Sequence, residues 1–378
     1  MAPVTQLLAL GLLSVGSLAH PGHSVAEEAA ERAAFASLKP RSVRSCASEL
    51  KRRGHLETAL ARRQAFAKQA RAKRSIPADK PLARRDFSDY DFSHLSTSGV
   101  KYGDDELTLF SDNSSCVLQP EVTQGPYYID GELIRSDMSE DQAGVPLFVD
   151  IQLIDTSTCA PAPAIYVDAW HCNSTGVYSG VSARGNGDSD DTSNLDNTFN
   201  RALQQTDVNG VVQFETTFPG HYTGRATHIH VLTHNADSTI IRTNGTLLEN
   251  AGNFTTSSSH VGQIFFDQDL ISQVEATEPY VSNTQELTLN SEDFILAQEA
   301  ADMDPFVEYV MIGDSIEDGI LAWISLGIDP SVDDSIGSAG TYYKEGGVAN
   351  PKSGMGGPPP GNGTFPPGWS PPNGTTAA

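Results

Sequence analysis

The sequence lacks three features, and each absence excludes a class of protein. Beyond the first 19 residues it has no apolar run near the roughly 20 residues that cross a bilayer. Only four of its 378 residues are cysteine, too few for a fold held mainly by disulfides. Residues 86–378 contain 8 Lys and Arg against 42 Asp and Glu. This region should repel anionic ligands, so we do not expect a nucleic-acid partner. The missing apolar run means that we do not expect a membrane span either.

The N-terminus has the pattern of a secretory signal peptide. An apolar run at 7–15 is followed by the small residues 17–19, and we expect cleavage after residue 19. Sequons for N-glycosylation follow at Asn113, Asn173, Asn244, Asn253, Asn362 and Asn373. The sequence therefore predicts a secreted, extracellular glycoprotein, and it leaves the oligomeric state open.

The four cysteines suit an oxidising compartment and allow three pairings. If the strands expected near 147–154 and 165–171 pair with each other, Cys159 lies in their connection and Cys172 at the far end. A Cys159–Cys172 bridge is then disfavoured, because bridged Cα atoms lie within about 7 Å. We predict the pairs Cys46–Cys159 and Cys116–Cys172.

Residues 20–85 form a basic segment, since residues 1–85 carry 16 Lys and Arg against 6 Asp and Glu. Its pattern predicts helices over 24–38 and 43–73. The basic pairs Lys73-Arg74 and Arg84-Arg85 would suit a propeptide that is removed. We favour a helical arm that packs on the rest of the chain or on a partner subunit, because removal would leave a thiol unpaired.

The middle of the chain, residues 86–332, alternates or runs apolar in short segments that predict a β-sandwich. We expect a helix over 291–301 and a loop over 186–200 at the mouth of a site. Residues 333–378 are rich in Gly and Pro and predict a disordered tail. The fold class is therefore mainly β, an antiparallel sandwich with a helical arm and a disordered tail. The expected strands are 145–154, 165–171, 210–218, 226–233, 238–242, 262–266 and 306–312.

Two histidines and two tyrosines predict a metal site in this sandwich. His228 and His230 are two residues apart on an expected strand, so they point to the same face about 6.6 Å apart at their origins. Tyr222 precedes them across a Gly-containing turn, and Tyr178 ends an earlier motif. An ionised phenol is a hard anion that suits a hard, highly charged ion. This donor set favours non-haem iron(III).

The order of the motifs resembles the intradiol ring-cleavage dioxygenase family, which includes catechol 1,2-dioxygenase and protocatechuate 3,4-dioxygenase. The resemblance covers about residues 112–329. The motifs that carry it are Gly125-Pro126-Tyr127-Tyr128, Trp170-x-x-Asn173-x-x-Gly176-x-Tyr178, Pro219-Gly220-x-Tyr222 and Arg225-x-x-His228-x-His230.

The resemblance implies that Tyr178, Tyr222, His228 and His230 bind iron(III). It also implies that a catechol or polyphenol is cleaved with O2 to a cis,cis-muconate-type diacid. Tyr222 would leave the metal as the substrate binds, Arg225 would stabilise negative charge on the ring, and Gln263 would lie beside the iron. For Asp168 and Trp170 we favour core packing, and we assign neither His171 nor His221 as a ligand.

Two other functions fit parts of this pattern. His228, His230 and His234 share a strand face and could bind zinc in a hydrolase. A secreted β-sandwich could also bind polyphenols or a surface partner without catalysis. The two tyrosines count against zinc, and the presence of all four expected ligands counts against a pure binding module.

The chain departs from the bacterial pattern of this family before the histidines. The interval from Tyr222 to His228 is shorter, and Gly224-Arg225-Ala226-Thr227 replaces the usual Trp-Arg-Pro lead. We therefore expect a more open site mouth. The scarcity of cations predicts that neutral catechols, hydroxyquinol or larger plant polyphenols are preferred to the carboxylated protocatechuate.

Overall fold

The fold is taken from a computed structural model, which describes residues 43–77, 116–117, 127–183, 185–188, 191–241, 246–248, 254–302 and 304–351. The signal peptide, the helix expected over 24–38 and the pair Arg84-Arg85 lie outside the described residues. So do all the sequons except Asn173. No helix in the described ranges is long and apolar enough to cross a membrane.

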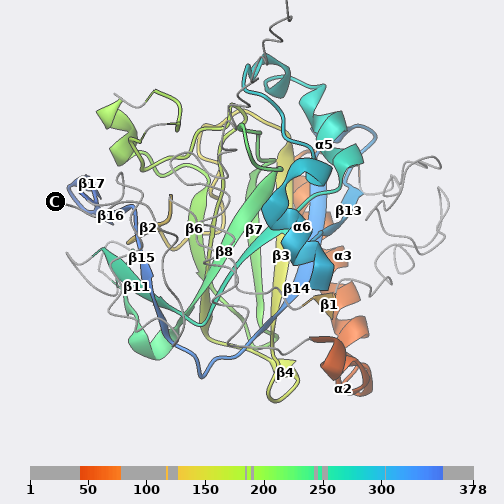
Figure 1. Cartoon of the computed structure of the whole chain (residues 1–378). Helices are drawn as coiled ribbons and strands as arrows, with labels where there is room; N and C mark the ends of the chain where they lie inside the picture. The colour runs from red at the N-terminus through yellow and green to blue at the C-terminus, as the bar shows by residue number, and fades with distance from the viewer. Residues whose placement is uncertain are drawn as a thin grey trace, which may run out of the picture.

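Two β-sheets pack face to face around one apolar core, as expected for a sandwich (Figure 1). The first sheet has six strands, and the second has four in the order β12-β8-β5-β6. The strands of the first sheet are β1 (Cys116–Val117), β3 (Pro146–Asp155), β4 (Ala160–Pro161), β7 (Val211–Thr217), β13 (Glu308–Met311) and β14 (Ile320–Ile328). Those of the second are β5 (Ile165–Trp170), β6 (Arg201–Gln205), β8 (His228–Asn235) and β12 (His260–Phe265).

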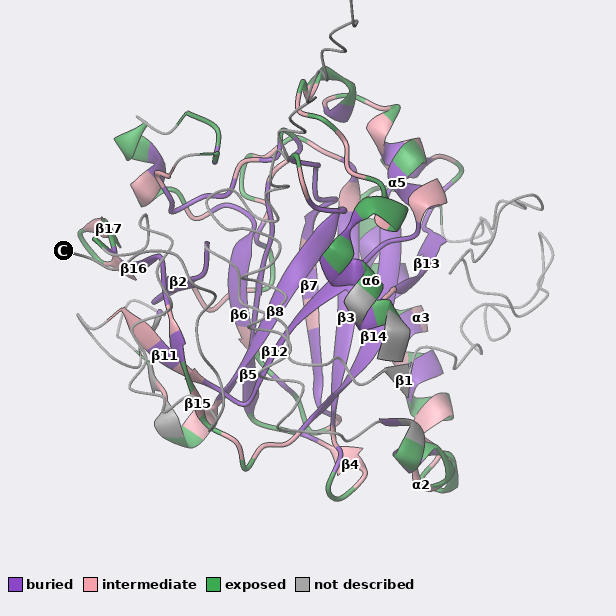
Figure 2. Ribbon diagram, viewed as in Figure 1, coloured by how far each residue is buried: buried purple, intermediate pink, exposed green. Residues whose placement is uncertain are grey.

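Alternation along the strands separates the core from the outer faces. In β8, Ile229 and Val231 belong to the core, whereas His228 and His230 lie on the opposite face. All these strand positions are buried, because other segments cover the outer faces as well (Figure 2). The sandwich therefore has three buried layers of side chains, one between the sheets and one outside each sheet.

Strand pairing differs from the expectation in two places. β14 runs parallel to β3, so the first sheet is mixed, whereas the four-stranded sheet is antiparallel throughout. The strands β3 and β5 lie in different sheets and do not pair. β14 was not among the expected strands, because its nine residues are apolar or small and buried on both faces, and such a run shows no alternation.

The basic segment forms an arm that packs on the outer face of the first sheet. After η1 (Val43–Cys46) and α2 (Ala47–Arg52), α3 (His55–Lys73) begins at Gly54, whose φ of 67° is left-handed. Phe66 of α3 packs edge-on against Phe148 of β3, with ring centroids 5.9 Å apart. The single helix expected over 43–73 is thus broken at Gly54, where the chain turns.

Charge also docks the arm on the sheet. Arg62 donates to Asp150 of β3 at 2.9 Å, and Arg63 lies over the ring of Trp323 of β14, 5.1 Å from its centroid. Burial alone would raise the pKa of Asp150, but the charges of Arg62 and Arg63 outweigh it and hold that pKa below its ordinary value. The carboxylate therefore stays charged beneath the helix.

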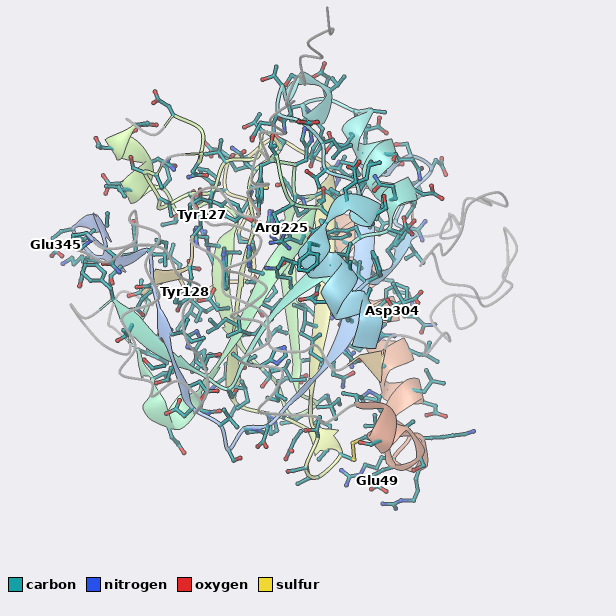
Figure 3. All side chains as sticks on the ribbon, in the orientation of Figure 1. Glu49, Tyr127, Tyr128, Arg225, Asp304 and Glu345 are labelled. Atoms are coloured by element: carbon teal, nitrogen blue, oxygen red, sulfur yellow. A yellow bond between two sulfur atoms is a disulfide. The ribbon has the colours of Figure 1, made fainter. Side chains whose placement is uncertain are left out.

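A disulfide joins the arm to the sandwich, and it is one of the two predicted. Cys46 is bonded to Cys159, in the turn after β3, across a sequence separation of 113 residues. Figure 3 shows this bond near Glu49. The other predicted pair is wrong, because Cys172 is a free, buried thiol. Cys172 follows β5 in the second sheet, whereas Cys116 pairs with β14 in the first.

The chain does not become disordered at residue 333 as expected. Strand β15 (Asp334–Gly337) pairs with β11 (Thr255–Ser258), and β16 (Gly340–Tyr343) pairs with β17 (Gly346–Ala349) and with β2 (Ile129–Asp130). Composition alone was misleading here, because long-range pairing satisfies the backbone of this Gly-rich segment. The Pro-rich residues 352–378 lie outside the described residues.

Short helices complete the described fold. The helix expected over 291–301 is α6 (Phe294–Asp302), and α5 (Gln268–Glu275) was not expected. The strand expected over 238–242 is reduced to β9 (Ile240–Ile241), which pairs with β10 (Leu247–Leu248). The single-turn helices are η2 (Thr192–Asp196), η3 (Ala236–Ser238), η4 (Tyr280–Ser282), η5 (Asn290–Glu292) and η6 (Ile316–Asp318).

Candidate metal centre

The outer face of the four-stranded sheet carries the two predicted histidine ligands. His228 and His230 begin β8 and lie on one face, as the alternation predicts. Their Nε2 atoms are 3.0 Å apart. Trp170 of β5 is paired with His230 across the strands, and its ring stacks on that imidazole at 4.8 Å between centroids. Trp170 is fully buried in an apolar cluster on this outer face, which agrees with the expected packing role, and it also sets the orientation of His230.

Two glycines bring the tyrosine segments together beside these histidines. Gly176 has a left-handed φ of 79°, and a Cβ there would lie 2.2 Å from the carbonyl oxygen of His221. A Cβ on Gly220 would lie 2.5 Å from the backbone of Ser174. Only glycine permits this mutual approach. It is the physical reason for a glycine before each of the two tyrosines.

The polar ends of the four predicted ligands converge. The Oη atoms of Tyr178 and Tyr222 are 3.3 Å apart, and the Oη of Tyr222 is 3.3 Å from the Nε2 of His228. Two atoms about 2.1 Å from one ion lie about 3.0 Å apart at a right angle and about 3.4 Å apart at the tetrahedral angle. The donor spacing thus fits a single cation, and all four side chains are at most 2% exposed.

Burial determines the pKa of the two tyrosines, and hydrogen bonding determines the tautomer of His228. Burial raises the pKa of both Tyr178 and Tyr222 well above the usual range, so ionising them requires a strong positive charge nearby. The Nδ1 of His228 lies 2.6 Å from the carbonyl oxygen of Ala226 and must donate to it. The lone pair of a neutral His228 then lies on Nε2, toward the other donors.

A zinc site of three histidines is not assembled. His234 shares the strand face, but its Nδ1 lies 2.9 Å from the carbonyl oxygen of Ser257 and its Nε2 is 3.7 Å from Asp168. No group of three or more His, Cys, Asp and Glu side chains in the described part of the chain could hold a metal ion. The donor atoms that lie beside His228 and His230 are instead the two tyrosine oxygens.

Residues of the 186–200 loop fix the backbone at Tyr178. Asn186 accepts from the Tyr178 amide at 2.7 Å, and Asn186 and Asn194 both donate to its carbonyl oxygen, at 2.8 and 2.9 Å. Arg201 of β6 donates to the Ser179 carbonyl oxygen at 3.0 Å. The sequence indicated a loop at the site mouth, but no motif marked these three side chains as its supports.

Arg201 also pairs with Glu132 at 2.9 Å and donates to the Tyr127 carbonyl oxygen at 2.7 Å. Burial and the neighbouring Asp168 raise the pKa of Glu132 well above its ordinary value. One buried arginine thus ties the Gly-Pro-Tyr-Tyr segment to the Tyr178 segment. Figure 3 labels Tyr127 in the upper half of the molecule, as it does Arg225.

The two other predicted site residues, Arg225 and Gln263, contact each other, and Gln263 lies on β12, the strand that pairs with β8 on the side away from β5. Arg225 donates to the Oε1 of Gln263 at 2.5 Å, and Gln263 is the cross-strand partner of His230. Arg225 also pairs with Asp293 at 2.9 Å, and both are fully buried. Burial would raise the pKa of Asp293, but the charge of Arg225 and the hydrogen bonds from the Leu296 and Ala226 amides together keep that pKa below the ordinary value. Asp293 was not anticipated from the sequence.

The turn between Tyr222 and His228 is held by residues 283–288, although Thr223 itself is exposed. Thr288 accepts from the Gly224 amide at 2.8 Å, and Asn283 donates to the His221 carbonyl oxygen at 2.8 Å. His221 itself pairs with Glu275 at 2.8 Å and serves this packing. Residues 283–288 thus hold this shorter turn in place, and the more open site mouth stays a prediction.

Comparisons with known proteins agree with the motif order. Residues 120–286 match the model of the family described as Dioxygenase. A solved intradiol ring-cleavage dioxygenase from Tetranychus urticae is 32% identical, with 57% of this chain and 96% of that protein covered and a TM-score of 0.44. None of the curated proteins compared with the chain matches it.

Two bacterial structures are more distant. The dioxygenase domain of a carbohydrate-binding fusion protein from Streptomyces sp. SirexAA-E is 19% identical, covering 56% of this chain and 98% of that one, with a TM-score of 0.33. Catechol 1,2-dioxygenase from Acinetobacter sp. ADP1 is 20% identical, covering 56% and 62%, with a TM-score of 0.35. With 32% identity across 96% of the Tetranychus urticae protein and the family match over residues 120–286, the chain belongs to the intradiol ring-cleavage dioxygenase family.

Proposed function

We propose that this protein is a secreted non-haem iron(III) dioxygenase that cleaves catechol-type rings between the two hydroxyl-bearing carbons. The bond between these carbons breaks and each gains one atom of O2, so that catechol becomes cis,cis-muconic acid. The observation that carries this proposal is the convergence of two buried phenols and two imidazoles at spacings that suit one ion. When bound, iron(III) would supply the Lewis acidity that ionises the phenols and withdraws electron density from the substrate.

In this proposal three side chains hold the metal and a fourth, Tyr222, accepts a proton. His228 and His230 would hold the metal throughout, fixed by the Ala226 carbonyl oxygen and the Trp170 ring. Tyr178 would remain bound, because its backbone is fixed by Asn186 and Asn194. Tyr222 would accept a proton from the catechol, since a phenolate is a base of suitable strength once the metal is no longer bound to it.

Gln263 presents a donor to the same space. An arginine has no acceptor, so the Gln263 oxygen must face Arg225 and its amide nitrogen must face away. That nitrogen is fully buried and has no hydrogen-bond partner among the described residues. It could donate to a substrate oxygen, which supports a role for Gln263 beside the reacting ring.

The substrates that fit best are uncharged catechols, hydroxyquinol or larger polyphenols. Residues 86–378 hold only 8 basic side chains, so few cations could bind a carboxylated ring. Secretion, proposed from residues 1–19, would direct the activity at extracellular phenols.

The test is a visible spectrum of the purified protein, before and after anaerobic addition of catechol, with iron measured on the same sample. We expect a red-brown tyrosinate-to-iron(III) band that shifts with catechol, then a diacid carrying two labels from ¹⁸O2. A protein that stays colourless, iron-free and inactive after iron is supplied would leave a binding module as the better account.

A matched pair of tyrosine variants separates ligands from neighbours. Tyr178→Phe should abolish iron retention, because it removes a ligand oxygen. Tyr127→Phe should retain iron, although the Tyr127 ring lies only 5.1 Å from that of Tyr178. Equal iron contents in the two variants would contradict the ligand assignment.

A further inference from the structure

The carboxylate of Asp293 connects the site to helix α6, and it lies beyond the segment matched by the family model. One oxygen accepts from the Nε of Arg225 at 2.9 Å and from the Ala226 amide at 2.8 Å. The other accepts from the amides of Ile295 and Leu296, at 2.8 and 3.0 Å. Four N–H groups thus converge on one buried side chain.

Through these bonds Asp293 fixes two parts of the site at once. It holds Ala226, whose carbonyl oxygen accepts from His228 at 2.6 Å. It also holds Arg225, which in turn orients the Gln263 amide. The other buried arginine near the site, Arg201, bonds the side chain of Glu132, whose pKa is raised, whereas that of Asp293 is lowered.

The pairing changes what Arg225 can do to a substrate. An unpaired, buried guanidinium would attract a carboxylate strongly, since charges interact more strongly in a protein interior than in water. Paired with Asp293 at 2.9 Å, Arg225 contributes directed N–H groups but almost no net charge. It can support the ring oxygens without attracting a carboxylated ring.

We propose that Asp293 determines substrate charge selection by neutralising and positioning Arg225, so that catechols without a ring carboxylate are bound in preference to carboxylated ones. This inference rests on the proposed function. Asp293 is a positioning residue, because it acts on the substrate through Arg225 and Gln263. The competing account is that Asp293 only caps α6, in which case its removal would lower stability and leave selectivity unchanged.

The experiment compares equilibrium binding of catechol and protocatechuate to the iron-loaded protein without oxygen, measured from the shift of the visible band. The quantity compared is the ratio of the two dissociation constants, protocatechuate over catechol. Asp293→Asn leaves Arg225 with uncompensated charge and should lower this ratio about tenfold or more. Arg225→Gln leaves the carboxylate of Asp293 unpaired and should raise it.

A matched control tests the helix-capping account. Asp267 is another buried carboxylate that caps a helix, and it accepts from the Leu270 amide at 2.7 Å and from the Tyr309 hydroxyl at 3.4 Å. Neither of these partners belongs to the metal centre. Asp267→Asn should lower the melting temperature and leave the ratio as in the wild type. An equal change of the ratio in both aspartate variants would overturn the proposal.

Each remaining outcome decides one point. An Asp293→Asn protein that binds iron and shows the wild-type ratio overturns the role of Asp293, even if its melting temperature falls. If that variant does not fold, Arg225→Gln decides, and a wild-type ratio there also overturns the proposal. A wild-type protein that gives no band and cleaves no catechol refutes the proposed function itself, and the selectivity inference with it.

Discussion

The outer faces of the two sheets are both buried, but by different chemistry. On the first sheet, α3 covers Phe148, Leu321 and Trp323 with apolar side chains and adds one docking ion-pair cluster at Asp150. On the second sheet, loops cover a face rich in tyrosine, histidine and arginine. The same strand alternation thus produces a stabilising interface on one side and a candidate reactive site on the other.

The polar outer face of the second sheet should contribute less to stability than the apolar outer face of the first. Buried polar groups cost stability unless each is bonded, and beside the second sheet Asn186 of a loop and Arg201 of β6 each bond several of them. The arm adds a second apolar interface, with Phe66 packed on Phe148, that includes none of the candidate ligands. We therefore expect changes in the arm to affect stability and changes on the site face to affect metal binding.

The largest expected effect is on iron binding. His230→Ala should weaken iron retention by at least about a hundredfold, since it removes a ligand and not merely a supporting group. The visible band and the bound iron report this loss. Retention of iron at the wild-type level would show that the site face has another ligand set and would break the comparison.

The next effect is on stability alone. Phe66→Ala, in the arm, should lower the free energy of unfolding by about 3–5 kcal/mol by leaving a cavity against Phe148. Denaturant unfolding measures this, and iron content should not change. The exposed Gln69→Ala on the same helix is the control and should alter neither quantity by much. Loss of iron in Phe66→Ala would show that the two faces are coupled.

Reduction of the Cys46–Cys159 disulfide should cost about 2–4 kcal/mol, because the bridge closes a long loop in the unfolded chain. Thermal unfolding with and without a reductant measures the cost. The double variant Cys46→Ala, Cys159→Ala should be insensitive to the reductant. If the reductant also lowered the melting temperature of the double variant, the effect would not come from this disulfide.

The last prediction concerns the pH dependence of the free energy of unfolding, for which we compare His171 near the second sheet with His55 of the arm. Burial, with nearby arginine charge, lowers the pKa of both His171 and His55 to about 4. Such a group contributes its full stability above its unfolded pKa of about 6.5 and loses it as the pH falls toward 4. Between these two pKa values, His171 should lower the free energy of unfolding by about 1 kcal/mol for each pH unit of acidification.

Single variants separate the two contributions. His171→Gln should remove more of this slope than His55→Gln, because His55 is only partly buried and more screened by solvent. The free energy of unfolding between pH 4 and 7 measures both. A larger loss of slope in His55→Gln would place the acid-sensitive group in the arm.

Local pattern was sufficient where a structure repeats along the chain. Alternation predicted β3, β5, β7 and β8, and it placed His228 and His230 on one face. It was insufficient for β14, whose residues are buried on both faces, and for the Gly-rich strands after residue 333. Those strands form only because a distant segment offers a partner, which no local window contains.

The sequence by itself determined the types of candidate donor and their order, because two tyrosines and a His-x-His stand in the family pattern and predict a hard metal ion. Only the tertiary structure decided what surrounds them. Asp293 lies 68 residues from Arg225 in the chain, and nothing in its local sequence distinguishes it from an ordinary helix cap. Neutralising a charge depends on distance in space, and only folding sets that distance.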